Sequence, residues 1–71
     1  MISIEHLGSR ITERRKACGL TQFQVAEALG VTPQAVSKWE RGLAFPDIAY
    51  LDDLAELLCV SIDALLRGVP A

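Results

Sequence analysis

Long apolar runs are missing from this sequence. Hydrophobic residues make up 51% of its 71 residues, but polar and charged side chains interrupt them well before the roughly 18 consecutive apolar residues that a membrane-spanning helix needs. The first ten residues mix Glu5, His6 and Arg10 into their apolar positions, which a secretory signal peptide does not do. We therefore expect no membrane partner and a cytoplasmic protein.

Thiol and imidazole groups are few. The chain has two cysteines, Cys18 and Cys59, and one histidine, His6, whereas a closed structural zinc site takes four such ligands. The cysteines lie far apart in the sequence and outside any C-x-x-C spacing. They either form a disulfide or remain as two buried, reduced thiols, and the second alternative is favoured in a cytoplasmic helical domain. The sequence predicts no metal and no cofactor.

No set of side chains has the spacing of a catalytic site. Asp52 and Asp53 are neighbours in a predicted helix, so their carboxylates point away from each other. Together with Glu56 they are typical of the solvated side of an amphipathic helix. His6 belongs to no motif that contains a nucleophile. We therefore expect that this chain is not an enzyme.

Signals for β-strands are absent as well. The chain has no Asn-Gly or Asp-Gly hairpin turn and no sustained alternation of apolar and polar residues. With 71 residues it has room for one core only. The sequence predicts an all-α fold and a single domain, residues 1–71, in which residues 68–71 form a tail or begin a linker.

What the sequence does contain is apolar periodicity of the helical kind. Residues that recur at three- and four-residue steps predict five helices, over about residues 4–17, 22–29, 33–41, 48–58 and 62–67. The residues expected to face inward are Ile4, Leu7, Ile11 and Cys18 in the first helix, Val25, Ala26 and Leu29 in the second, Val36, Trp39 and Glu40 in the third, Ile48, Leu51, Leu54, Ala55 and Leu58 in the fourth, and Ile62, Leu65 and Leu66 in the last.

The residues at the helix ends agree with these boundaries. Pro33 stands at a first helical position, where its missing N–H group has no cost. Gln24 completes a capping box with Thr21. The expected N-caps are Thr21, Thr32, Asp47 and Ser61, and the glycines expected to end helices are Gly19, Gly30, Gly42 and Gly68.

Residues 21–41 have the features of a helix-turn-helix, in which two short helices meet across a tight turn. Ala26 is small enough for the helices to approach closely where they cross, and Gly30 tolerates the positive φ that the turn needs. Apolar residues stand where inward contacts are required. This geometry would direct Gln34, Ser37 and Lys38 outward together.

Motifs along most of the chain resemble those of the phage repressor/Cro-type (XRE-type) helix-turn-helix family. They are R-x-x-x-G-L-T-Q at residues 15–22, A-x-x-L-G-V at 26–31, S-K-W-E-R-G at 37–42, P-D at 46–47 and V-S-I-D-A-L-L-R-G at 60–68. Each motif alone is weak, but their order and spacing together are specific. The resemblance covers about residues 7–68 and implies a compact five-helix, lambda-repressor-like DNA-binding domain.

The resemblance also implies which residues contact DNA. The third helix would lie in the major groove and read bases from its N-terminal and outward residues. Gln34 is the strongest candidate, because an amide can pair with adenine N6 and N7. The matching positions for base contacts are Thr32, Pro33, Gln34, Ser37 and Lys38, and those for phosphate contacts are Gln22, Arg41 and Arg10.

Arg15 and Glu40 are both expected on inward-facing positions. Arg15 follows Ile11 by one turn on an apolar stripe, and Glu40 lies beside Trp39 on the inner face of the third helix. A buried charge is costly alone, so we predict that the two side chains form an ion pair. The family resemblance implies the same pair, with the structural role of holding the third helix against the first.

Charge is distributed unevenly about a net value of −2. Residues 1–41 carry six basic and four acidic side chains, whereas residues 42–71 carry one basic and five acidic ones. A basic face and an acidic back favour approach to a polyanion in one orientation. Because the positive charge per domain is small, we expect a homodimer on DNA that acts in transcription, most simply as a repressor.

Three features depart from the family pattern. Phe23 replaces a more usual polar residue, Cys59 stands where a glycine often ends the fourth helix, and residues 43–45 are apolar where basic groups are common. An alternative function is therefore a protein-interaction adaptor or antitoxin with the same fold. Such a protein would contact its partner through Phe23, Leu43 and Phe45.

Overall fold

The computed structural model describes residues 4–68 and contains five helices over that range. They are α1 (Ile4–Ala17), α2 (Gln22–Leu29), α3 (Pro33–Glu40), α4 (Ile48–Leu57) and α5 (Ile62–Arg67). No strand occurs within the described range, and the all-α prediction is confirmed. The helix boundaries agree with those expected from the sequence to within one residue. None of these helices is long and apolar enough to cross a membrane.

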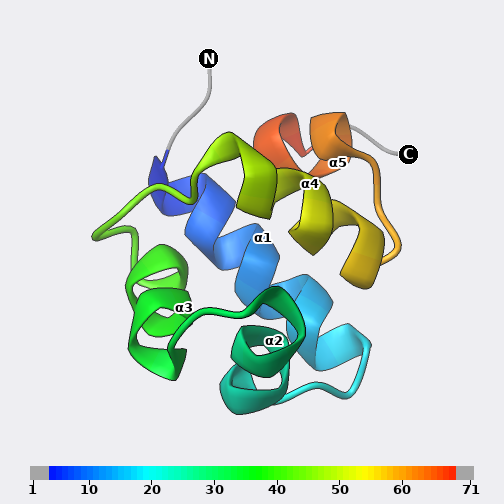
Figure 1. Ribbon diagram of the computed structural model, residues 1–71. Coiled ribbons are helices and arrows are strands. Elements are labelled where there is room, and N and C mark those ends of the chain that lie inside the picture. Colours follow the sequence, from blue (N-terminus) through cyan, green and yellow to red (C-terminus); the bar gives the residue numbers. More distant parts are fainter. Residues whose placement is uncertain (1–3, 69–71) are drawn as a thin grey trace.

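Helix α1 runs through the middle of the domain and contacts helices on both sides (Figure 1). It packs against α3 on one side and against α5 on the other. Helix α2 packs against α3 and α4, and α4 packs against α5. Helices α2 and α3 therefore lie together on one side of α1, with the outer surface of α3 at the edge of the domain (Figure 1).

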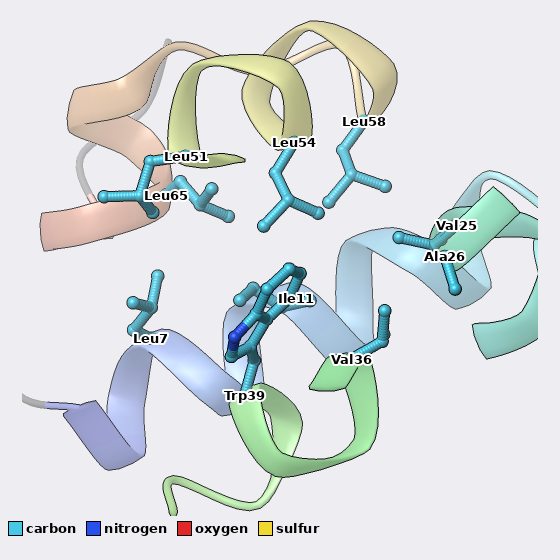
Figure 2. Close-up of a cluster of buried hydrophobic side chains, with 10 residues drawn as sticks. All are labelled: Leu7, Ile11, Val25, Ala26, Val36, Trp39, Leu51, Leu54, Leu58 and Leu65. Carbon is cyan, nitrogen blue, oxygen red and sulfur yellow. The ribbon is translucent and has the colours of Figure 1, made fainter. Parts of the chain in front are cut away.

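The core forms where all five helices meet. Its buried side chains include Trp39 from α3 and Leu54 from α4, which point toward one another in Figure 2. Trp39 is also 5.8 Å, between ring centroids, from Tyr50. The expectation that Trp39 belongs to the core is thus confirmed. The members of the cluster are Leu7, Ile11, Val25, Ala26, Val36, Trp39, Leu51, Leu54, Leu58 and Leu65.

Three residues expected to face inward are exposed instead. Ile48 is 83% exposed, Ile62 is also exposed, and so is the Cys18 side chain. Ile48 and Ile62 are the first residues of their helices, and side chains lean toward a helix N-terminus, so they project past the edge of the core. Cys18 follows the last residue of α1 and no longer obeys the helical period. The Ile4 side chain lies outside the described residues.

Two helix ends also differ in detail from expectation. Asp47 occupies the N-cap position of α4 as predicted, but its side chain accepts no hydrogen bond from the helix backbone. The prediction is therefore right for the position and wrong for the capping interaction. At the other end, Cys59 has a φ of 57°, the left-handed conformation that glycine adopts most easily. Cys59 stands where the family often has a glycine, and its backbone has the conformation that such a glycine would adopt.

Gly8 sets the distance between α1 and α3. It is buried, and a Cβ atom added there would lie 2.5 Å from the carbonyl oxygen of Trp39 and 2.6 Å from that of Glu40. Any side chain would therefore separate the two helices. The sequence analysis did not single out Gly8, although a glycine inside a helical pattern is a known signal of close packing.

Candidate nucleic-acid interface

The turn between α2 and α3 has the conformation that the sequence predicts. Gly30 is left-handed, with φ 74°, and its N–H donates to the carbonyl oxygen of Ala26. Ala26 is buried at this crossing. The Thr21 side chain accepts from the backbone N–H of Gln24, and the Gln24 side chain accepts from that of Thr21. The capping box therefore fixes where α2 begins and how the chain enters it.

Helix α3 has one buried and one open face. Val36 and Trp39 point into the core (Figure 2). Gln34 and Lys38 are exposed, and Ser37 between them is half-buried. Positions 34, 37 and 38 share one helical face. The structure therefore brings these three predicted base-contacting residues together on the outside of the domain.

The N-terminus of α3 adjoins this face. The Thr32 hydroxyl oxygen accepts from the backbone N–H of Ala35 at 3.2 Å, as an N-cap does. Pro33 is the first residue of α3 and is half-buried. Thr32 thus has a structural role in addition to the base contact expected of it. Its hydroxyl hydrogen is still available as a donor, because a hydroxyl can donate and accept at once.

Arg15 and Glu40 form the predicted ion pair. The Arg15 Nε donates to Glu40 Oε2 at 2.6 Å, and Nη2 donates to Oε1 at 3.1 Å. The two side chains are 12% and 5% exposed. The two-point contact joins α1 to the last residue of α3, so it fixes the orientation of α3 relative to the centre of the domain.

Two further donors reach the Glu40 carboxylate. Thr12 Oγ1 lies 2.9 Å from Glu40 Oε1, and Gln22 Nε2 donates to the same oxygen at 3.1 Å. Burial by itself would raise the pKa of Glu40, but the hydrogen bonds from Arg15, Gln22 and Thr12 outweigh it and leave that pKa below its usual value. The carboxylate therefore stays ionised and binds three elements of the fold together.

Gln22 links this network to the surface. It is the first residue of α2 and is half-buried. Its amide uses one N–H group on Glu40, and an amide has two. The second N–H lies at a helix N-terminus, where free backbone N–H groups and the helix dipole favour an anion. The sequence analysis identified Gln22 but missed that Glu40 positions it.

The predicted phosphate contacts at Arg41 and Arg10 have different surroundings. Arg41 is exposed just beyond α3, and its Nε lies 3.4 Å from the carbonyl oxygen of Ser37. Arg10, in contrast, donates from Nε to the Leu65 carbonyl at 2.6 Å and from Nη2 to the Leu66 carbonyl. Arg10 therefore satisfies carbonyl groups near the C-terminal end of α5, as a cation at that end of a helix should.

Charges on the open side of α3 are positive. Lys38 and Arg41 are exposed there, while Glu40 turns inward and is neutralised by Arg15. The exposed carboxylates of Asp52 and Asp53 belong to α4, which lies on the other side of the domain from the outer face of α3 (Figure 1). Among residues 4–68 no three His, Cys, Asp or Glu side chains gather as metal ligands would.

This geometry, two capped helices across a left-handed glycine with one open helix face, agrees with the comparison with known families. The family profile described as "Helix-turn-helix" matches residues 11–65. The chain belongs to the helix-turn-helix family. The family predicted from the motifs is therefore confirmed.

Similar proteins support the assignment. The chain is 41% identical over 64 residues to the SPbeta prophage-derived uncharacterized HTH-type transcriptional regulator YonR of Bacillus subtilis. This match covers 90% of this chain and 59% of YonR. It is 39% identical over 59 residues to the HTH-type transcriptional activator BcrR of Enterococcus faecalis, covering 83% of this chain and 29% of BcrR. The chain therefore spans less than two thirds of the length of each of these relatives.

Among solved structures, the helix-turn-helix fold is matched closely by a repressor. The crystal structure of the P22 c2 repressor protein in complex with synthetic operator 9T superposes with a TM-score of 0.84 at 36% identity. The match covers 89% of this chain and 96% of that chain. The five-helix, lambda-repressor-like architecture expected from the motifs is thereby confirmed.

Proposed function

We propose that this helix-turn-helix domain binds double-stranded DNA sequence-specifically and regulates transcription, with α3 in the major groove. The observation that carries the proposal is the open face of α3, where Gln34, Ser37 and Lys38 project from a helix whose other face is anchored in the core. The major groove of B-DNA is wide enough to admit an α-helix. The operator-bound P22 c2 repressor has the same fold.

Direct readout is assigned to the open face and its N-terminal edge. Gln34 has the amide that pairs with adenine, and Lys38 can donate to guanine O6 or N7. Ser37 lies between them and can contact either kind of base. Thr32 and Pro33 begin α3 and adjoin the same surface, so they line the edge of the groove.

Phosphate binding is assigned to Gln22 and Arg41. The free amide N–H of Gln22 and the N-terminus of α2 would bind one phosphate, and the exposed Arg41 guanidinium would bind another. Arg10 is left out of this set, because two of its nitrogen atoms already donate to carbonyl oxygens of α5. Few cations thus face the DNA, and a single domain would bind it weakly.

Weak binding by one domain leads to the second part of the proposal, a homodimer. Two copies related by a two-fold axis would read half-sites centred about 34 Å apart. The simplest consequence is repression by occlusion of a promoter, in the cytoplasm where bacterial and phage DNA is transcribed. The domain itself performs no catalysis in this account.

The test is selection of bound sites from a pool of random double-stranded DNA. We expect an enriched palindrome whose half-sites are separated by one helical turn. The double variant Gln34→Ala, Lys38→Ala should lose binding to the selected site. Its matched control is Asp52→Ala, Asp53→Ala, which changes two exposed residues on α4 and should retain binding. Failure to enrich any sequence would contradict the proposal.

A second candidate function is binding of a protein partner, as in an adaptor or antitoxin. It is favoured by the exposure of Phe23, Leu43 and Phe45, whose exposed fractions are 62%, 65% and 45%. Exposed aromatic and aliphatic side chains of this size often mark interaction sites.

The two functions can be separated by two sets of substitutions. If DNA is the target, Gln34→Ala with Lys38→Ala abolishes binding while Leu43→Ser with Phe45→Ser preserves it. If a protein is the target, the effects are reversed. Circular dichroism on each variant shows whether it has kept its helical fold.

A further inference from the structure

The two cysteines, far apart in sequence, come together at one end of the domain. Cys18 follows the last residue of α1, and Cys59 follows the C-cap of α4. Both cysteines are free and both are exposed residues, so the expectation that they are buried was wrong. The turns that carry them lie on the same side of the domain, away from the outer face of α3 (Figure 1). Small reagents in solution can therefore reach both residues.

A hydrogen bond from Cys18 limits how far its sulfur atom can be from Cys59. The Sγ of Cys18 donates to the carbonyl oxygen of Leu58, 3.7 Å away, and Leu58 directly precedes Cys59. In a trans peptide the carbonyl oxygen is about 2.8 Å from the next Cα atom. The Cys18 Sγ is therefore at most about 6.5 Å from the Cα of Cys59. Within a cysteine the Sγ atom is about 2.8 Å from the Cα atom, so the Cα atoms of Cys18 and Cys59 lie at most about 9.3 Å apart. A disulfide requires them to be about 4.4–6.8 Å apart, so the two exposed turns have to approach each other by at most a few ångströms.

The turn at Cys59 is suited to such a shift. Its backbone has φ 57°, a left-handed conformation that is unfavourable for a residue with a side chain. The residue is exposed and lies outside α4 and α5. A change in its backbone angles therefore relieves an unfavourable conformation.

We propose that Cys18 and Cys59 form a redox-sensitive pair that closes to an intramolecular disulfide and fastens the end of α1 to the end of α4. The inference is independent of DNA binding. It rests on the contact between Cys18 and Leu58, on the exposure of both cysteines and on the left-handed turn at Cys59.

The oxidant is a low-molecular-weight disulfide. The thiolate of one cysteine attacks a sulfur atom of that disulfide, which forms a mixed disulfide and releases one small thiol. The thiolate of the second cysteine then attacks the protein-bound sulfur, forms the Sγ–Sγ bond and releases the second small thiol. Two electrons pass from the cysteines to the reagent, and the two thiol protons end on the released thiols. Excess reductant reverses both steps.

Oxidation should stabilise the domain, because the bond removes freedom from the unfolded chain. It closes a loop between residues 41 positions apart, and a native-like crosslink of that span in a domain of this size should raise the Tm by about 10 °C. The bond lies away from the open face of α3 (Figure 1), so it should act on stability without covering that surface.

The experiment is oxidation of the dilute, folded protein with glutathione disulfide, followed by intact-mass analysis, thiol titration and thermal unfolding. We expect a monomer lighter by the mass of two hydrogen atoms, with no free thiol and a higher Tm. Added reductant should return the Tm to its original value. The single variants Cys18→Ser and Cys59→Ser are the matched controls. Each should take up one glutathione and show no increase in Tm.

Phenylarsine oxide provides a second measurement, because its arsenic bridges two thiols only when they are close together. One arsenical bound per native wild-type chain, with both thiols consumed and neither single variant bridged, supports the pair. The proposal is overturned if the native wild type ends with two glutathione adducts or with disulfide-linked dimers. It is equally overturned if bridging by the arsenical occurs only in denaturant.

Discussion

The guanidinium of Arg15 holds the carboxylate of Glu40 by two hydrogen bonds, Nε to Oε2 at 2.6 Å and Nη2 to Oε1 at 3.1 Å. The pair joins α1 to the end of α3 at a place that water scarcely reaches, since the side chains are 12% and 5% exposed. The helix that presents Gln34 and Lys38 is thus anchored at its far end by an ion pair.

Removing one member of this pair should destabilise the domain strongly. Glu40→Ala leaves the Arg15 charge buried without its partner, and we expect a loss of about 3–5 kcal/mol in the free energy of unfolding. The double variant Arg15→Met, Glu40→Leu should lose less than Glu40→Ala alone, because no unpaired charge remains. Urea unfolding of the three proteins measures this. A double variant less stable than the single one would contradict the explanation.

The low pKa of Glu40 makes stability depend on pH. The carboxylate has a lower pKa in the folded state than the unperturbed value of 4.5, so the unfolded chain binds its proton first. Its contribution is therefore complete above about pH 4.5 and is lost as the pH falls through the folded-state pKa. Urea midpoints measured from about pH 6 down to pH 3 should fall more steeply for the wild type than for Glu40→Gln. Equal slopes would show that other carboxylates are responsible.

Gly8→Ala should destabilise the domain although alanine is the better helix former. The new Cβ atom would lie 2.5 Å from the Trp39 carbonyl oxygen, so α1 and α3 must separate. Because the new atom meets backbone oxygens, we expect an overpacking loss of about 3 kcal/mol, the upper end of the usual range, which exceeds the gain of about 1 kcal/mol in helix propensity. Ser9→Ala, at the exposed neighbouring position, is the control and should change stability little. Thermal unfolding compares the two variants.

Cys59→Gly should stabilise the reduced protein. At φ 57° glycine avoids the clash that a Cβ atom causes, and we expect a gain of about 0.5–1 kcal/mol after its extra chain entropy is counted. Cys59→Ala retains the Cβ atom and should give no gain. Chemical unfolding under reducing conditions tests the difference, and equal stabilities of the two variants would contradict it.

The proposed DNA contacts predict a salt dependence. If each domain of a dimer neutralises about two phosphates, at Gln22 and Arg41, the plot of log affinity against log salt has a slope near −4. Arg41→Ala should flatten the slope by about 2 per dimer, because each subunit loses one phosphate contact. Gln34→Ala should leave the slope unchanged and relax the preference for one base pair. A titration of DNA binding at several salt concentrations measures both, and an affinity independent of salt would rule out the electrostatic account.

The Arg15–Glu40 pair shows how far sequence reasoning reaches for non-local contacts. The pair was predictable because each charge stands on the inward face of its own helix and each needs a partner. The same reasoning did not find Thr12 and Gln22 as further donors to Glu40, since polar residues on a partly exposed surface have many alternative partners. Arg10 was interpreted as a phosphate ligand for the same reason.

The positions of Ile48 and Cys18 mark another limit. Helical periodicity assigns a face to each residue, but it does not say where the neighbouring helix stops covering that face. Ile48 is the first residue of α4 and Cys18 follows the last residue of α1, and both side chains are exposed because no neighbouring helix packs over them there. Exposure at helix ends therefore depends on the packing of the whole domain.

The sequence alone determined the elements and their boundaries: the capped starts at Thr21 and Thr32, the left-handed turn at Gly30, and the open face of α3. These features arise from interactions between residues a few positions apart, and such interactions can be predicted from the order of residues in the sequence. Only the tertiary structure decided that Gly8 lets α1 reach α3, that Arg10 satisfies carbonyls of α5, and that Cys18 meets the turn of Cys59. Each of these joins residues more than 30 positions apart, and the packing of the helices alone brings such residues together.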